Sequence, residues 1–216
     1  MSEIKIGRMV LGLCQTNCYF LYKEDQKLEN GHIPVIFVDP ADQGAGIYQA
    51  LLKNGFEVAA ILLTHGHFDH ILGAQELRGK SGAKIYAYAG EDRLLRDSGL
   101  NLSAGNGVGC TVRVNGYLQD GEKFSAAGME CEVIATPGHT EGSCCFYFKE
   151  AGILIAGDTL FEESVGRTDY PTGSMSALVQ SVKERLFVLP DETKVYPGHG
   201  GSTTIGWEKE HNPFLT

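Results

Sequence analysis

Three histidines and one aspartate lie close together in the stretch T-H-G-H-F-D-H (64–70): His65, His67, Asp69 and His70. The whole chain holds only seven histidines, so the cluster stands out. Imidazole and carboxylate groups without thiolate are typical ligands of zinc, iron or manganese. The spacing therefore predicts a metal site and disfavours a polar loop in which each histidine has only protein partners.

Three further segments each end in a residue that could join this cluster. His139 follows Pro-Gly in T-P-G-H-T, His199 follows Pro-Gly in Y-P-G-H-G, and Asp158 follows the apolar run I-L-I-A-G. Each is expected at the end of a buried strand, where rigid elements hold ligand geometry and loops leave an open position. Five histidines and two aspartates are too many for one tetrahedral ion. Two neighbouring ions fit, and they could share an acidified water aimed at a carbonyl carbon or a phosphorus atom.

The elements that must position these residues are short strands alternating with helices. In the first part we expect strands over 3–10, 17–22, 35–39, 58–64 and 84–88, and helices over 43–54 and about 70–79. In the second part we expect strands over 110–114, 129–136, 144–148, 152–156 and 194–196, and helices over 174–186 and 202–211. The glycine-rich segment 101–109 is expected to be a flexible loop. It is not expected to bind phosphate, because it lacks the G-K-S/T ending of a phosphate-binding loop.

Length and composition limit the class of protein. A chain of 216 residues fits a single domain over 1–216, without a separate C-terminal substrate domain. The net charge of −9 disfavours binding to nucleic acid or to anionic membranes, and no apolar run approaches the length of a membrane span. The N-terminus lacks the pattern of a signal peptide, so a cytoplasmic location with reduced cysteines is expected, as a monomer or small homo-oligomer.

The stretch His65-Gly-His67-Phe-Asp69-His70 resembles the hallmark H-x-H-x-D-H of the metallo-β-lactamase superfamily. Within it, T-P-G-H-T-E-G-S, A-G-D-T-L-F and V-G-R-T-D are similar to the glyoxalase II (hydroxyacylglutathione hydrolase) group, and the C-terminal segment resembles its short, single-domain bacterial members. The resemblance implies an α/β fold, a four-layer αβ/βα sandwich. Its metal site would lie at the edge where the strands of two β-sheets end.

The same resemblance implies a role for each candidate ligand. His65, His67 and His139 would bind a first metal, Asp69, His70 and His199 a second, and Asp158 would bridge them. One or two Zn²⁺ ions are expected, with iron or manganese as alternatives. Asp69 and Asp158 would act in catalysis together with a metal-bound hydroxide. In the lactamases proper a cysteine commonly occupies the position of Asp158, so this residue disfavours that activity.

The activity implied is hydrolysis of a small-molecule acyl-thioester such as S-lactoylglutathione. Arg167, which matches the group's G-R motif, Tyr170 and Lys209 are candidate substrate-binding residues. Arg167 could instead pair with Asp169, and Lys209 could be ordinary surface charge. Two alternatives stay open: a persulfide dioxygenase with a single iron held by His65, His139 and Asp158, and a metal-holding scaffold without turnover. Nuclease branches of the superfamily fit poorly with the net charge of −9.

Overall fold

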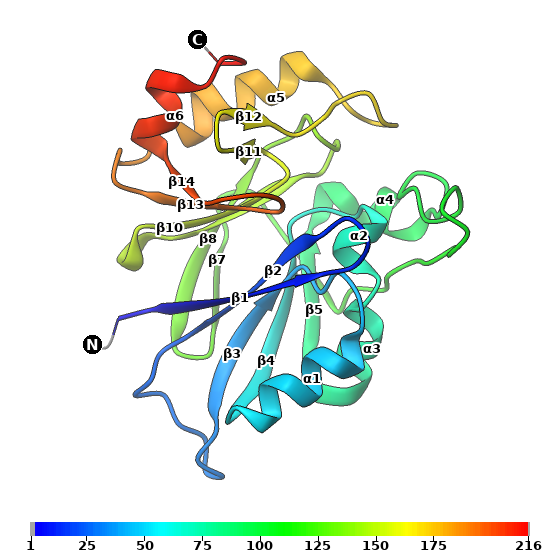
Figure 1. Ribbon diagram of the computed structural model, residues 1–216, viewed down its shortest axis with the longest axis vertical. Coiled ribbons are helices and arrows are strands. Elements are labelled where there is room, and N and C mark those ends of the chain that lie inside the picture. The colour runs from blue at the N-terminus through cyan, green and yellow to red at the C-terminus, as the bar shows by residue number, and fades with distance from the viewer. Residues whose placement is uncertain (1–2, 216) are drawn as a thin grey trace.

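Two six-stranded mixed sheets face each other in the computed structural model, which describes residues 3–215 (Figure 1). The first sheet has the strand order β1 (Lys5–Leu11), β2 (Thr16–Tyr22), β3 (Ile33–Val38), β4 (Phe56–Leu63), β5 (Lys84–Tyr88) and β6 (Gly116–Leu118). The second has the order β14 (Thr203–Thr204), β13 (Lys194–Pro197), β10 (Ile153–Gly157), β9 (Cys144–Phe148), β8 (Met129–Ala135) and β7 (Lys123–Ala126). β3 to β6 are parallel, as are β10 and β13, and the other neighbours in these sheets are antiparallel.

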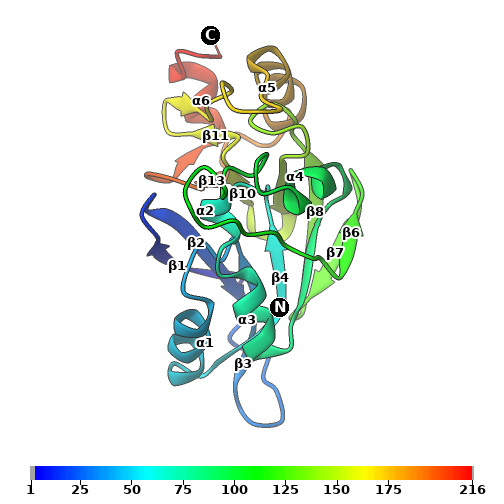
Figure 2. The ribbon, with the colours of Figure 1, turned by 90° about the vertical axis from the view of Figure 1, so that its right-hand side faces the viewer.

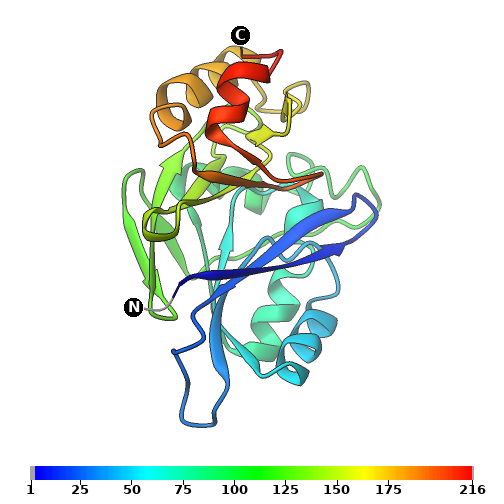
Figure 3. The same ribbon diagram turned by 60° about the vertical axis from the view of Figure 1, so that its left-hand side comes forward.

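Helices cover the outer face of each sheet, at opposite ends of the molecule (Figures 2 and 3). The first sheet packs against α1 (Gly44–Lys53) and α3 (Ala74–Ser81), through residues that include Ile47 and Leu77. The second packs against α5 (Met175–Ser181), its π-helical continuation Val182–Leu186, and α6 (Ile205–His211). The four-layer αβ/βα sandwich is therefore confirmed. Across residues 3–215, no helix has the length and apolar character needed to cross a membrane.

Alternation along the strands explains why both faces of each sheet are buried. On β9, Cys144, Phe146 and Phe148 point into the core between the sheets, whereas Cys145 and Tyr147 point toward the helices. The adjacent cysteines thus belong to two different core layers, because successive side chains in a strand point to opposite faces. All six cysteines are free, as predicted.

The helix predicted over 70–79 is in fact two helices, α2 (Phe68–Ile71) and α3, which are separated at Gly73. The backbone N–H of Gly73 donates to the carbonyl of Pro40 over 2.8 Å. A Cβ atom at Gly73 would lie 2.8 Å from the Asp42 carbonyl oxygen. The break therefore follows from close backbone packing against the segment after β3, which the local pattern does not reveal.

The strand predicted over 110–114 is wrong. Val112 is buried, as the alternation suggested, but its N–H donates to the carbonyl of Leu95 at the end of α4 (Asp92–Arg96) instead of to a neighbouring strand. In the described part of the chain, the segment belongs to neither sheet. The parallel strand at this edge of the sheet is instead β6, a few residues later in the chain. The sequence patterns did not predict β6, β7, β14, α4 or the small hairpin of β11 (Leu160–Phe161) and β12 (Ser164–Val165).

The core between the sheets makes a direct prediction about stability. Phe146 is fully buried there, whereas Phe214 is 50% exposed. Phe146→Ala is expected to lower the free energy of unfolding by about 3–5 kcal/mol, because it removes a large side chain and leaves a cavity. Phe214→Ala is expected to change it by no more than about 0.5 kcal/mol. Guanidinium unfolding of both variants tests this, and similar losses would contradict it.

Candidate metal centre

The candidate ligands all follow strands of the two facing sheets. β4 leads into His65 and His67, and α2 carries Asp69 and His70. On the second sheet, β10 ends directly before Asp158, and β8 and β13 lead to His139 and His199. The two sheets therefore deliver the histidine-rich stretch and the three isolated ligands to the same place.

The first cluster consists of His65, His67 and His139. Each offers a ring nitrogen, and these atoms all lie within 4.8 Å of one another. His67 Nδ1 and His139 Nε2 are 2.8 Å apart. All three side chains are buried, with at most 3% of each residue exposed. Three imidazoles converging in this way can hold one metal ion and leave a position for water.

The second cluster consists of Asp69, His70 and His199, whose ligand atoms also lie within 4.8 Å of one another. Asp158 contacts both clusters. Its Oδ1 lies 3.3 Å from His70 Nε2, and its Oδ2 lies 3.6 Å from His139 Nε2 and 3.5 Å from His199 Nε2. A carboxylate between two sets of ligands is what a bridge between neighbouring ions requires.

Unsatisfied polar atoms support a resident metal. Among the described residues, four buried side-chain atoms lack a hydrogen bond, and three of them belong to candidate ligands: His65 Nε2, His67 Nε2 and Asp158 Oδ1. Asp158 Oδ1 is near His70 without hydrogen-bond geometry. Buried polar groups in proteins rarely lack partners. Coordination to a metal ion would supply the partners that the protein does not.

Burial keeps the first cluster neutral. It lowers the pKa of His65 well below its usual value, lowers that of His67 to about 3, and lowers that of His139. The imidazoles also disfavour each other's protonation, because a second positive charge nearby is unfavourable. A neutral imidazole is the form that binds a metal, so these three residues are prepared as ligands near neutral pH.

The second cluster is charged without metal. Burial disfavours the protonated form of His199, but hydrogen bonds to Asp158 and Asp69 outweigh it and raise its pKa to about 9. For Asp69, burial opposes ionisation, while His70 and His199 bring its pKa down to about 2. This cluster is therefore a network of ion pairs between carboxylates and protonated imidazoles. A metal ion can bind His199 only after the imidazole has lost its proton.

Asp39 forms hydrogen bonds that orient the ligand histidines, and it was not identified from the sequence. Its Oδ2 lies 2.9 Å from His70 Nδ1 and accepts from the Thr64 hydroxyl, and its Oδ1 accepts from the Thr64 N–H. Thr64 Oγ1 in turn lies 3.1 Å from His65 Nδ1. Although Asp39 also lies close enough to His65 and His70 to count as a metal ligand, these bonds occupy both of its oxygens. Such outer partners fix the orientation of ligating histidines.

The start of β2 supports the second cluster and was also missed. The Thr16 hydroxyl donates to Asp69 Oδ2 over 3.0 Å. The side-chain amide of Asn17 donates to the carbonyls of Pro197 and Gly200, on either side of His199. The only signal in the sequence was a polar pair at the start of a strand-like run.

A cavity of about 690 Å³ opens beside both clusters. Of the predicted substrate-binding residues, Arg167 and Tyr170 line it. The Arg167 guanidinium donates two hydrogen bonds to Asp169, over 2.8 and 2.7 Å, and lies 4.0 Å from the centre of the Tyr170 ring. Lys209 is not among the residues that line the cavity, and its Nζ lies 2.5 Å from Asp191. A substrate role for Lys209 stays a prediction.

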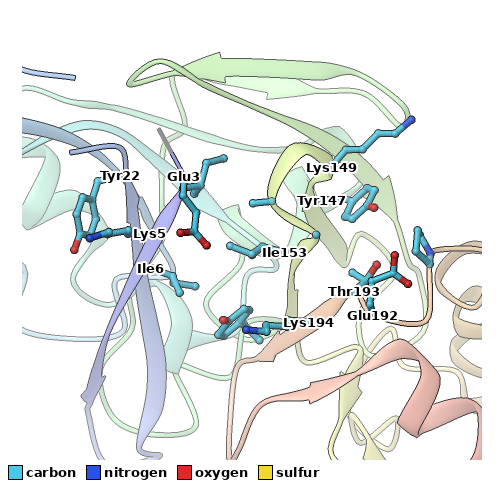
Figure 4. Close-up of a pocket in the computed structure, with 15 residues that line it drawn as sticks. Glu3, Lys5, Ile6, Tyr22, Tyr147, Lys149, Ile153, Glu192, Thr193 and Lys194 are labelled. Atoms are coloured by element: carbon cyan, nitrogen blue, oxygen red, sulfur yellow. The ribbon is translucent and has the colours of Figure 1, made fainter. Parts of the chain in front are cut away.

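A second cavity, of about 600 Å³, lies at the other ends of β10 and β13, where these strands begin. Figure 4 shows Lys5, Ile153 and Lys194 among the side chains around it. The residues described along its walls include no histidine and no cysteine. It therefore lacks the chemistry of the metal centre.

Comparisons with known proteins identify the family of the chain. Residues 11–199 match the family model described as the metallo-beta-lactamase superfamily. The chain is 38% identical to the probable metallo-hydrolase YqgX of Bacillus subtilis, over 98% of both proteins, and 30% identical to the hydroxyacylglutathione hydrolase GloC of Haemophilus influenzae, over 93% of both.

Two solved structures are similar over almost the whole chain. BLEG-1, a B3 metallo-beta-lactamase, has a TM-score of 0.90 and 34% identity, covering 98% of this chain and 100% of that one. TTHA1623, in a di-iron-bound form, has a TM-score of 0.82 and 32% identity, covering 97% and 100%. The chain therefore belongs to the metallo-β-lactamase superfamily, as its motifs indicated.

The charge state of the second cluster predicts that metal uptake releases protons. Because the pKa of His199 is about 9, it carries a proton below that pH and must lose it to become a ligand. Zinc affinity is therefore expected to rise from about pH 6 to about pH 9 and then level off. Calorimetric titration in buffers of different ionisation enthalpy measures the released protons, and His199→Ala should release fewer. Uptake without proton release would contradict the prediction.

Proposed function

We propose that this protein is a metal-dependent hydrolase that cleaves acyl-thioesters such as S-lactoylglutathione. The observation that carries the proposal is Asp158, which contacts two clusters of metal-capable side chains at the wall of a substrate-sized cavity. The similarity to a protein named hydroxyacylglutathione hydrolase supports the thioester as substrate.

The proposed ligands form two sets that share one carboxylate. His65, His67 and His139 would hold one ion, Asp69, His70 and His199 the other, and Asp158 would reach both. Zinc suits imidazole and carboxylate ligands, and the di-iron form of TTHA1623 makes iron the main alternative. When bound, such ions lower the pKa of a water molecule toward neutrality and polarise the carbonyl group of a substrate.

The chain's own residues would place the substrate and limit water. Asp69 and Asp158 are the two carboxylates among the described residues that line the cavity, with side chains 15% and 11% exposed. Apolar side chains that include Leu102, Phe161 and Val165 form another part of its wall. An acyl group held against this wall would present its carbonyl to the ligand clusters. Because a thiolate is a good leaving group, positioning and activation of water are the main requirements.

Thiol release from S-lactoylglutathione by the metal-loaded protein tests the proposal. Asp158→Ala is expected to lower kcat/KM by about 10³-fold, since it removes the shared ligand and several kcal/mol of stabilisation. Asp191→Ala is the matched control, because this exposed aspartate pairs with Lys209 and does not line the cavity. Its kcat/KM is expected to stay within about twofold of the wild type.

Three other results would contradict the proposal. Absence of thiol release above the Asp158→Ala background would exclude hydrolysis of the glutathione thioester. Bound iron with oxygen uptake in the presence of a persulfide would favour the dioxygenase alternative. Hydrolysis of a chromogenic cephalosporin without thioester cleavage would favour a lactamase, the class named for BLEG-1.

We further propose that Arg167 and Tyr170 contact the thiol carrier. Arg167 lies over the Tyr170 ring at the cavity wall, and that ring lies 5.7 Å from the His67 ring. Arg167→Ala is expected to raise KM for S-lactoylglutathione about tenfold, the effect of one charged contact, with little change in kcat. Lys209→Ala tests the remaining candidate, and an equal rise in KM for both variants would contradict a special role for Arg167.

A further inference from the structure

Glu91 is a buried carboxylate that lies outside the proposed ligand set. It ends the short 3₁₀ helix Ala89–Glu91 and is 1% exposed. Its Oε1 accepts a hydrogen bond from the backbone N–H of Gly66 over 2.7 Å, and its Oε2 accepts from the Thr140 hydroxyl over 3.0 Å. The N–H of Gly142 is a further donor to it.

The donors belong to the two loops that carry the first cluster. Gly66 lies between His65 and His67, and Thr140 directly follows His139. The three histidines reach the cluster from different sheets, because His65 and His67 follow β4 and His139 follows β8. One side chain therefore ties together the two segments whose separation sets the distances between these ligands.

Close packing maintains this connection. A Cβ atom at Gly142 would lie 2.2 Å from the carbonyl carbon of Gly90 and 2.3 Å from the Glu91 nitrogen, so the His139 loop rests directly on the backbone of the 3₁₀ helix. A Cβ atom at Gly66 would lie 3.3 Å from Glu91 Oε1. Both loops approach so closely because glycine occupies the contact position on each.

The second cluster has different supports. Asp69 is held by Thr16, His70 by Asp39, and the loop of His199 by Asn17. None of the hydrogen bonds found for Glu91 in the described part of the chain goes to these residues. Asp39 also reaches His65 of the first cluster through Thr64. The hydrogen bonds of the Glu91 side chain, in contrast, go only to the loops that carry the first cluster.

We propose that Glu91 is a positioning residue that sets the metal affinity of the cluster His65, His67 and His139 and leaves that of the second cluster unchanged. A carboxylate fits this task because it only accepts hydrogen bonds, whereas a glutamine would turn an N–H₂ group toward one of the three donors. Loss of one bond would let the loops move apart and misplace the imidazoles. The proposal holds whichever substrate the site acts on.

Glu208 provides a matched control. It is a fully buried carboxylate on α6 that also has three donors: the Thr203 hydroxyl, the Asn212 amide and the Glu163 N–H. None of these donors is adjacent in sequence to a proposed ligand. Glu208→Gln therefore perturbs a comparable buried network away from the metal centre.

The test is a titration of metal-free protein with Co²⁺ in competition with a chelator, followed by absorption. Burial raises the pKa of Glu91 to about 7, so the titration is done near pH 8.5, where the group is ionised. The two bound metal ions are assigned with His139→Ala and His199→Ala, each of which lacks one ligand of one cluster. Glu91→Gln is expected to weaken binding of the Co²⁺ ion that His139→Ala loses by about 10–100-fold and to change its absorption bands. The affinity for the other Co²⁺ ion is expected to stay within about threefold of the wild type.

Glu208→Gln is expected to leave the affinity for both Co²⁺ ions unchanged. If Glu91→Gln does not fold, Thr140→Val removes one of the same hydrogen bonds with little change in shape, and it is expected to weaken binding of the same Co²⁺ ion about tenfold. The proposal would be overturned if Glu91→Gln weakened the binding of both Co²⁺ ions equally, or if Glu208→Gln had the same effect as Glu91→Gln. Wild-type affinity for both ions in Thr140→Val would also overturn it.

Discussion

Burial of Asp158 among imidazoles is the constraint on which the rest of the site depends. Burial opposes ionisation of this carboxyl, yet His70, His199 and His139 keep its pKa well below the usual range. A charge in such a place is stable only when positive charge or donors surround it. The two sheets meet these demands together, since β10 supplies the carboxylate and segments after β4, β8 and β13 supply the imidazoles.

Close backbone approach makes this arrangement possible. A Cβ atom at Gly198 would lie 2.2 Å from Asp158 Oδ1 and 2.6 Å from His70 Cε1, so the loop before His199 can reach the carboxylate only with glycine there. Gly157 has a φ of +48° and lies against Thr64, which lets β10 end beside the histidine-rich stretch. The high glycine content of the chain is thus partly a property of the metal centre.

The seven candidate ligands could be predicted from short segments of the sequence, and the layered fold from the resemblance of those segments to the metallo-β-lactamase superfamily. A run of apolar residues followed by His or Asp marks a strand end. The residue types and spacing of the H-x-H-x-D-H stretch indicate metal ligands without further context. Asp39, Asn17 and Glu91 could not be recognised in this way, because their roles depend on contacts with residues far along the chain. Glu91 stands in the polar segment G-E-D-R, which gives no sign that its side chain is buried.

Strand partners were equally hidden from local patterns. The segment 110–114 alternates like a strand, but Val112 bonds to the end of α4, and β7 has a buried Phe124 but too little other apolar character to be noticed before β8 pairs with it. Strand assignment depends on the neighbour, whereas ligand type depends only on the residue itself. For this reason the residues that meet at the proposed metal centre were predicted more completely than the elements at the edges of the sheets.

The most direct test of the central claim is a crystal structure of the zinc-loaded protein with anomalous data collected at the zinc edge. The account predicts two peaks about 3.5–4 Å apart, with Asp158 reaching both. One would lie about 2.0–2.1 Å from nitrogens of His65, His67 and His139, and the other would be bound by Asp69, His70 and His199. A single peak, or two peaks of which only one contacts Asp158, would contradict it.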